Sequence, residues 1–201
     1  MTTLSPTELL PTRPFTHPDH TSSDLKTLLY MLERVCVFIE FNRTHEHLQH
    51  PVLLPEPDGR AHRYIIPNPI QLLEAHDLAV VGFFGHKRPD ATPDHHFGSL
   101  GDTIMRQIPS YRDILGYSNM ALDDDNFSNL VLLRNETVKQ VWLEGEAHTQ
   151  AVSRSPGYYA TIRIYNGTLA GVAAPQTMHL TNVKYYDFQT EPYWRAERSL
   201  T

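Results

Sequence analysis

Histidine is the residue type most able to carry chemistry in this chain, because twelve of its 201 residues are histidines. His45, His47 and His50 form the tightest group, with Glu46 between the first two, and zinc accepts these side chains as ligands. Their spacing, H-E-H-x-x-H, matches no closed four-ligand pattern. A metal-dependent activity is therefore kept as a third hypothesis, and no metal site is assigned.

A second set of candidate residues follows further along the chain. Trp142 and His148 lie six positions apart on a predicted helix, and Tyr159, Arg163 and Tyr165 then alternate with apolar residues on a predicted strand. His148 could accept a proton near neutral pH, and Arg163 could bind a carboxylate or phosphate. The alternative is a core tryptophan beside a locally bonded histidine, with Arg163 pairing an acidic residue across a dimer boundary.

The elements that would position these residues alternate between strand and helix patterns. In chain order they are strand 78–84, a helix from Ser99, strands 117–122 and 129–133, a helix from Asn135 to Pro156, and strand 158–165. Ser99 and Asp102 form a capping box at the start of the first helix. This β-α-β-β-α-β order is that of a ferredoxin-like unit. On the second helix, the stripe expected to be buried comprises Val138, Val141, Gly145 and Val152.

The flanking segments predict additions to that unit. Residues 1–22 read as a flexible arm, and 23–76 as an extension with a helix over 25–39, capped by Ser23 or Asp24, and a short helix after Asn68. A strand over 35–41 is the rival interpretation of the first helix's end. Within the main domain, 77–201, the Asn166-Gly167 pair predicts a turn, and 178–188 predicts an extra C-terminal strand before a charged tail.

Composition narrows the possible partners and compartments. The formal charge is −6 and no run of Lys and Arg is present, which argues against nucleic acid and anionic membranes as partners. The lone Cys36 cannot form an internal disulfide, and the N-terminal 21 residues lack a signal-peptide pattern, so a cytoplasmic protein is expected. Nucleotide-binding loops, a G-x-S-x-G elbow and a Cys-His pair are missing from the sequence, which disfavours nucleotide-driven and acyl-transfer chemistry.

The run from Val141 to His148, V-W-L-E-G-E-A-H, resembles the second helix of the antibiotic-biosynthesis-monooxygenase group of dimeric α+β barrels. The resemblance covers roughly residues 78–166. It implies a homodimer, and an activity such as cofactor-independent monooxygenation of electron-rich substrates, with Trp142 and His148 at the site. A haem-degrading branch of the group also uses an Asn on its first strand, and Val80–Phe84 contains none. No cofactor is therefore expected, and haem is the secondary possibility.

Together these patterns predict an α+β protein: a ferredoxin-like sandwich of the dimeric α+β barrel type with an N-terminal helical extension. Helices would cover one sheet face, and the other face would need a second copy, the N-terminal half or a small molecule to cover it. The first hypothesis is a small-molecule-binding protein, with a monooxygenase acting on an aromatic or enolic substrate as its catalytic form. There His148 is the catalytic base, and the substrate is bound by Trp142, Tyr159, Arg163 and Tyr165. The second hypothesis is a non-catalytic oligomeric or regulatory protein whose sheet face is a dimer seam.

Overall fold

The computed structural model describes residues 1–41, 50–91, 95–123 and 126–201. Its strands are β1 (Thr2–Leu4), β2 (Val52–Pro55), β3 (Ala61–Ile65), β4 (Leu78–Lys87), β5 (Ile114–Ala121), β6 (Phe127–Leu133), β7 (Tyr159–Leu169), β8 (His179–Asp187) and β9 (Trp194–Ser199). Its α-helices are α1 (Asp19–Phe41), α2 (Pro69–Glu74), α3 (His95–Gln107), α4 (Glu136–Leu143) and α5 (Glu146–Tyr158). Short 3₁₀ turns lie at Pro14–Thr16, Ile108–Ser110 and Pro175–Thr177. The α+β class predicted from the sequence is confirmed.

All the described strands join in one mixed sheet with the order β1-β9-β8-β7-β4-β6-β5-β3-β2. The β1–β9 pair is parallel, and the other neighbouring pairs are antiparallel. Residues predicted as arm, extension and main domain therefore contribute strands to the same sheet. One strand, over 178–188, was expected after β7, followed by a charged tail. Strand β8 is that strand, but the tail prediction is wrong, because Trp194–Ser199 forms a further strand, β9, that pairs with β8.

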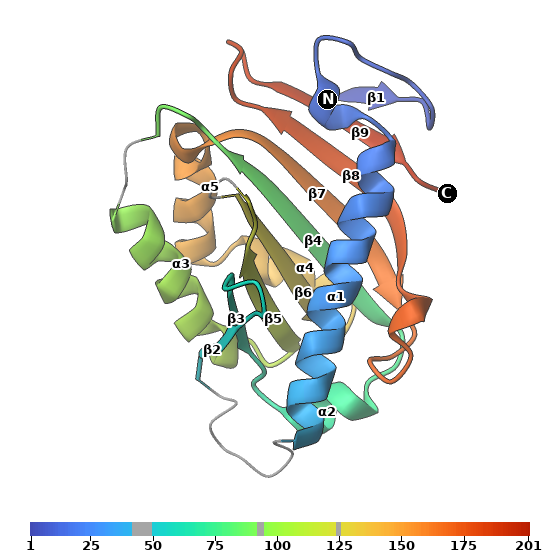
Figure 1. Cartoon of the computed structure of the whole chain (residues 1–201), viewed down its shortest axis with the longest axis vertical. Helices are drawn as coiled ribbons and strands as arrows, with labels where there is room; N and C mark the ends of the chain where they lie inside the picture. Colours follow the sequence, from blue (N-terminus) through green and yellow to red (C-terminus); the bar gives the residue numbers. More distant parts are fainter. Residues whose placement is uncertain (42–49, 92–94, 124–125) are drawn as a thin grey trace.

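Each face of the sheet carries its own apolar core. Side chains of β4 alternate between the two: Val80 and Phe84 pack with α1, whereas Ala79 and Val81 pack with α3 and α4. Figure 1 shows α1 lying along one face of the sheet. The face opposite α3 and α4 is therefore covered by the N-terminal part of the same chain, which is one of the three ways foreseen for completing it.

Helix α1 forms because its apolar residues recur at helical spacing. Leu28, Met31, Leu32, Val35 and Ile39 are all buried against the sheet. The helix continues to Phe41, so the rival strand over 35–41 is wrong. It also begins earlier than expected, at Asp19, and Asp24 is therefore a buried residue of the second turn and not an N-cap.

The first 22 residues, expected to be a flexible arm, are attached to the sheet. Strand β1 pairs with β9, and the guanidinium of Arg198, which is fully buried, donates to the carbonyl oxygens of Thr16 and Glu8 at 2.9 and 2.6 Å. No local pattern predicts this attachment, because Arg198 lies about 180 residues away in a segment that reads as polar.

The predicted long helix after Asn135 is two helices. Asn135 caps α4 as predicted, but Gly145 begins a new helix, α5, which changes the direction of the following side chains. Val141 and Val152 are therefore 60% and 57% exposed, so the expected buried stripe is wrong at these two positions, whereas Val138 packs against the core as expected. Helix α3 likewise starts at His95 rather than Ser99, so that Asp102 lies inside it and pairs with Arg63.

Strand β7 runs through the predicted Asn166-Gly167 turn to Leu169, with a register shift against β8 at that point. A Cβ atom at Gly167 would overlap the carbonyl oxygen of His179, so the glycine permits a close strand approach there and not a turn.

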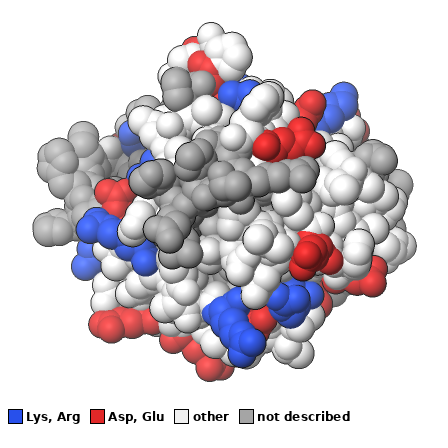
Figure 2. All heavy atoms as spheres, turned by 90° about the horizontal axis from the view of Figure 1, so that it is seen from below, with Lys and Arg blue, Asp and Glu red and all other residues white. Residues whose placement is uncertain are grey.

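Charges on the described surface are mixed in sign. Figure 2 shows acidic and basic side chains interspersed over the end of the molecule seen from below. Among the described residues, no helix has both the length and the apolar character needed to cross a bilayer.

Candidate functional site

Arg163 and Tyr165 of β7 face α1 and share one partner, Asp24. The Asp24 carboxylate accepts from Arg163 Nε and Nη2 at 2.7 and 3.0 Å, and from the Tyr165 hydroxyl at 2.8 Å. The side chains of Asp24 and Arg163 are 7% and 16% exposed. Burial alone would lower the pKa of Arg163, but Asp24 outweighs it and raises that pKa, while burial and Asp24 together raise the pKa of Tyr165. This bidentate pair fixes α1 on the sheet.

Tyr159 lies on the opposite face from Arg163, so the prediction that they share one face is wrong. The β4–β7 ladder pairs His86 with Thr161 and Lys87 with Tyr159, which leaves Ala160 as an extra residue in β7. This irregularity reverses the alternation of side chains. The Tyr159 ring consequently packs edge-on against Phe83, with 5.4 Å between ring centroids.

Trp142 and His148 also lie on the face that α3 and α4 cover. Trp142 is buried and packs edge-on against Tyr117, and its ring centroid is 4.5 Å from that of His148. Burial lowers the pKa of His148, and the nearby carbonyl of Leu143 opposes this in part. Its Nδ1 atom is buried without a hydrogen-bond partner among the described residues.

The five predicted site residues, the catalytic base His148 and the four residues predicted to bind substrate, therefore do not line one pocket. The sheet separates Trp142, His148 and Tyr159 from Arg163 and Tyr165. Sequence periodicity placed Arg163 and Tyr165 on the face opposite the helices, which is their observed position, but it could not show that Asp24 would occupy them.

A hollow of about 470 Å³ lies on the α1 side of the sheet, next to Arg163. We call it the β4–β7 hollow. Its lining comes from five segments and three single residues: residues 12–15, His20 near the start of α1, residues 84–86 of β4, Ala160, Thr161 and Arg163 of β7, Asp187 at the end of β8 with Gln189, and Pro89, Leu122 and Asn126. Aromatic rings and polar groups both contribute to this lining.

The charges around the β4–β7 hollow are balanced. Arg163 pairs with Asp24, and Arg13 Nε lies 3.3 Å from Asp187 Oδ2. His20 is neutral at pH 7, because burial and then the charge of Arg163 lower its pKa below 6.5. The Nε2 atom of His20 lies 3.2 Å from the carbonyl oxygen of Pro14. Since a carbonyl only accepts, Nε2 carries the hydrogen, and Nδ1 is the acceptor.

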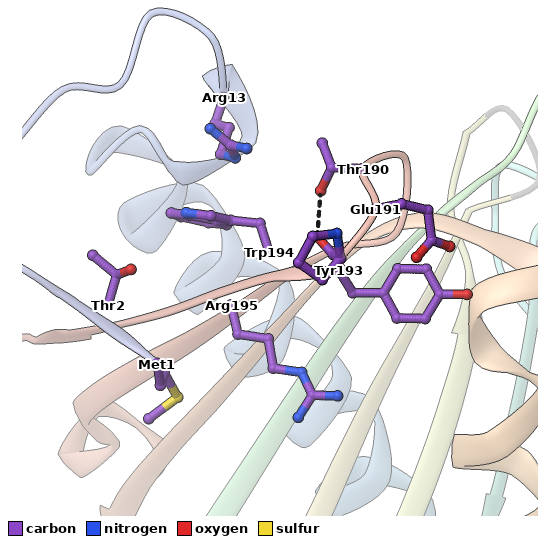
Figure 3. A pocket seen from close by; sticks show the side chains of 9 residues that line it. Met1, Thr2, Arg13, Thr190, Glu191, Tyr193, Trp194 and Arg195 are labelled. Carbon is purple, nitrogen blue, oxygen red and sulfur yellow. Dashed lines mark hydrogen bonds between the residues drawn. The ribbon is translucent and has the colours of Figure 1, made fainter.

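A second hollow, of about 520 Å³, lies where the N-terminus meets the residues before and within β9. The Arg13 guanidinium stacks over the Trp194 ring there, 4.4 Å from its centroid. Figure 3 shows Glu191 and Tyr193 directed away from Trp194 and Arg13, so the polar groups do not converge on one point. The β4–β7 hollow is therefore the better candidate site.

No family model, curated protein or solved structure matches the chain. Membership of the antibiotic-biosynthesis-monooxygenase group therefore stays a prediction, made from the Val141–His148 run alone.

Metal binding has no support within residues 1–41, 50–91, 95–123 and 126–201, where no group of three His, Cys, Asp or Glu side chains could hold an ion. Of the predicted histidine group, His50 is exposed, and His45 and His47 lie outside the described residues.

A buried polar network that sequence reasoning missed connects α1 to the other half of the sheet. His62 Nδ1 lies 2.7 Å from Glu56 Oε1, and His62 Nε2 lies 2.5 Å from Ser118 Oγ. Tyr30 and Arg34 of α1 donate to the same Glu56 carboxylate. All three of Glu56, His62 and Ser118 are buried, and no local motif announces them because they come from three separate segments.

Proposed function

We propose that the chain binds a small, weakly acidic organic molecule of the phenol or enol class in the β4–β7 hollow. The observation that carries the proposal is a hollow of about 470 Å³ in which His20 and Arg163 meet aromatic walls. A volume of this order is typical of small-molecule sites. Both guanidinium groups at the hollow already have carboxylate partners, which favours a neutral or weakly acidic ligand over a phosphorylated one.

Cofactor-independent oxygenation is the catalytic form of this proposal. A neutral His20 would take the hydroxyl proton at Nδ1, and Arg163 would stabilise the resulting anion, which then reacts with molecular oxygen. The support is the lowered pKa of His20 together with its place beside Arg163. The role of base thus moves from His148, which lies across the sheet, to His20.

For the fold, we propose that residues 78–169 are a ferredoxin-like unit. The support is the order β4-α3-β5-β6-α4/α5-β7 along the chain with the order β7-β4-β6-β5 in the sheet. Helix α1 covers the face through which a dimeric barrel would pair. A homodimer therefore stays a prediction and requires another surface.

Replacing His20 with phenylalanine should weaken binding of 4-nitrophenol, catechol and acetylacetone about fivefold. The substitution keeps a ring of similar size but removes the Nδ1 acceptor, and one neutral hydrogen bond contributes about 1 kcal/mol. Isothermal titration calorimetry at pH 7 measures the change.

The matched control is His17→Phe, three residues earlier and exposed, which should bind the probes as the wild type does. Equal affinities for the two variants, or a wild type with no saturable binding of any of the three probes at millimolar concentration, would contradict the proposal.

A further inference from the structure

We infer that Ser118, His62 and Glu56 form a nucleophilic site for small carboxylic esters, separate from the β4–β7 hollow. Their side chains form a continuous chain from hydroxyl to imidazole to carboxylate, with separations of 2.5 and 2.7 Å. This is the arrangement in which a histidine activates a serine and a carboxylate orients the histidine, and it is recognised by geometry rather than sequence order.

The strand register explains why distant residues meet. In the β3–β5 ladder Ser118 stands opposite Tyr64, and His62, two residues before Tyr64, faces the same side. Glu56 directly follows β2, at the start of the turn to β3. Arg34, at 3.1 Å, and Tyr30 hold its second oxygen from α1. Motifs such as G-x-S-x-G, whose absence disfavoured acyl transfer, are local and could not report this long-range arrangement.

Electrostatics fix the direction of each hydrogen bond. A carboxylate only accepts, so His62 Nδ1 carries the hydrogen, and Nε2 accepts from the Ser118 hydroxyl. Burial lowers the pKa of His62 below 6.5 although Glu56 opposes it, and the imidazole is neutral at pH 7. Burial raises the pKa of Glu56, but hydrogen bonds from Tyr30 and His62 and the charge of Arg34 outweigh it and keep the carboxyl ionised.

The reaction that this geometry supports is ester hydrolysis in two steps. Ser118 Oγ forms a bond to the ester carbonyl carbon while its proton moves to His62 Nε2, and the alcohol leaves with that proton. Water then attacks the acyl-serine, again losing its proton to Nε2, which returns it to Ser118 as the acid departs. Glu56 orients the imidazole and stays ionised throughout.

The residue opposite Ser118 in the β3–β5 ladder, Tyr64, carries a hydroxyl that could donate to the substrate's carbonyl oxygen. The Tyr64 hydroxyl is buried and has no hydrogen-bond partner within the part of the chain that the structure describes. A buried hydroxyl without a hydrogen-bond partner lowers the stability of the folded chain unless another molecule supplies the partner. Tyr64 is therefore assigned to the substrate oxygen as negative charge develops on it.

Access limits the substrate to small acyl groups. Ser118 is 3% exposed, whereas Tyr30 and Arg34 on α1 are half-buried and lie at the edge of the network. A substrate must pass these two side chains to reach the serine.

Folded wild-type protein treated with diisopropyl fluorophosphate should gain one phosphoryl adduct at Ser118, as intact mass and peptide mapping would show. Ser118→Ala should gain none at that peptide, and Glu56→Gln should react at least about 100-fold more slowly because its histidine is no longer oriented. The labelling rate of the wild type should fall as the pH drops through the pKa of His62, below 6.5.

Ser128→Ala is the matched control, because Ser128 is a buried serine on the neighbouring strand β6 that hydrogen-bonds to Met31. It should label as the wild type does. Failure of the folded wild type to label, an adduct at any residue other than Ser118, or a rate independent of pH would show that the network is structural only. These results leave ligand binding at the β4–β7 hollow unaffected, so the two proposals fail separately.

Discussion

Replacing Asp24 with alanine should lower the free energy of unfolding by about 3–5 kcal/mol, because it leaves the buried Arg163 without its counter-charge. The hydroxyl of Tyr165 loses its acceptor in the same change. Urea denaturation at pH 7, followed by circular dichroism, measures the effect as a lower midpoint at an unchanged m-value.

Two variants separate this ion pair from a general effect of changing α1. Asp19→Ala removes a carboxylate that is 91% exposed in the first turn of the same helix, and should change stability by less than about 0.5 kcal/mol. Asp24→Ala combined with Arg163→Met removes both charges and should recover part of the loss. A double variant less stable than Asp24→Ala alone would show that Arg163 does not depend on Asp24.

The second large effect is loss of stability in acid. The pKa of His62 is below 6.5 in the folded chain, so as the pH falls through 6.5 the unfolded chain binds a proton that the folded chain does not. Unfolding is therefore favoured, by at most about 1.4 kcal/mol per pH unit for each such proton. The lowered pKa of Glu56 acts in the same direction, and its contribution is lost as the pH falls below 4.5.

The variant His62→Gln tests this assignment. It should flatten the fall in stability between pH 7 and 5, measured by urea denaturation at each pH, because one proton fewer is taken up on unfolding. Burial also lowers the pKa values of His20 and His148, so a smaller slope should remain. Exposed His179→Gln should leave the slope of the wild type unchanged; a similar slope in both variants would assign the acid sensitivity to other groups.

Local patterns predicted the elements of this fold better than their ends and junctions. The apolar run at Leu78, the Asn68-Pro69 helix start and the Asn135 cap all give the elements expected from them. The predicted helix divides at Gly145, against which the Tyr111 hydroxyl of another segment lies, and the irregularity at Ala160 arises in the pairing of β7 with β4. Periodicity within one segment does not contain that information.

The candidate sites depend even more on long-range contacts. The sequence predicted that Arg163 lies on a strand, but not that it pairs with Asp24, which lies 139 residues earlier and was predicted as a possible helix cap. His62 and Ser118 are 56 residues apart, and neither stands in a motif. Pairings of this kind are set by which faces of the sheet α1 and the strands bring together, and only the three-dimensional structure reveals them.

Both proposed sites require that α1 lies over the sheet face that carries Arg163. The Cγ atom of Leu28 is 3.4 Å from where a Cβ atom at Gly82 would stand, which brings cysteines at these positions within reach of a disulfide. With Cys36 replaced by serine, Leu28→Cys/Gly82→Cys should form an intramolecular disulfide under mild oxidation, seen as the loss of two thiols by mass. The exposed control Lys26→Cys/Gly82→Cys should stay reduced. If the first pair stays reduced, or links two chains, α1 does not cover this face of its own sheet.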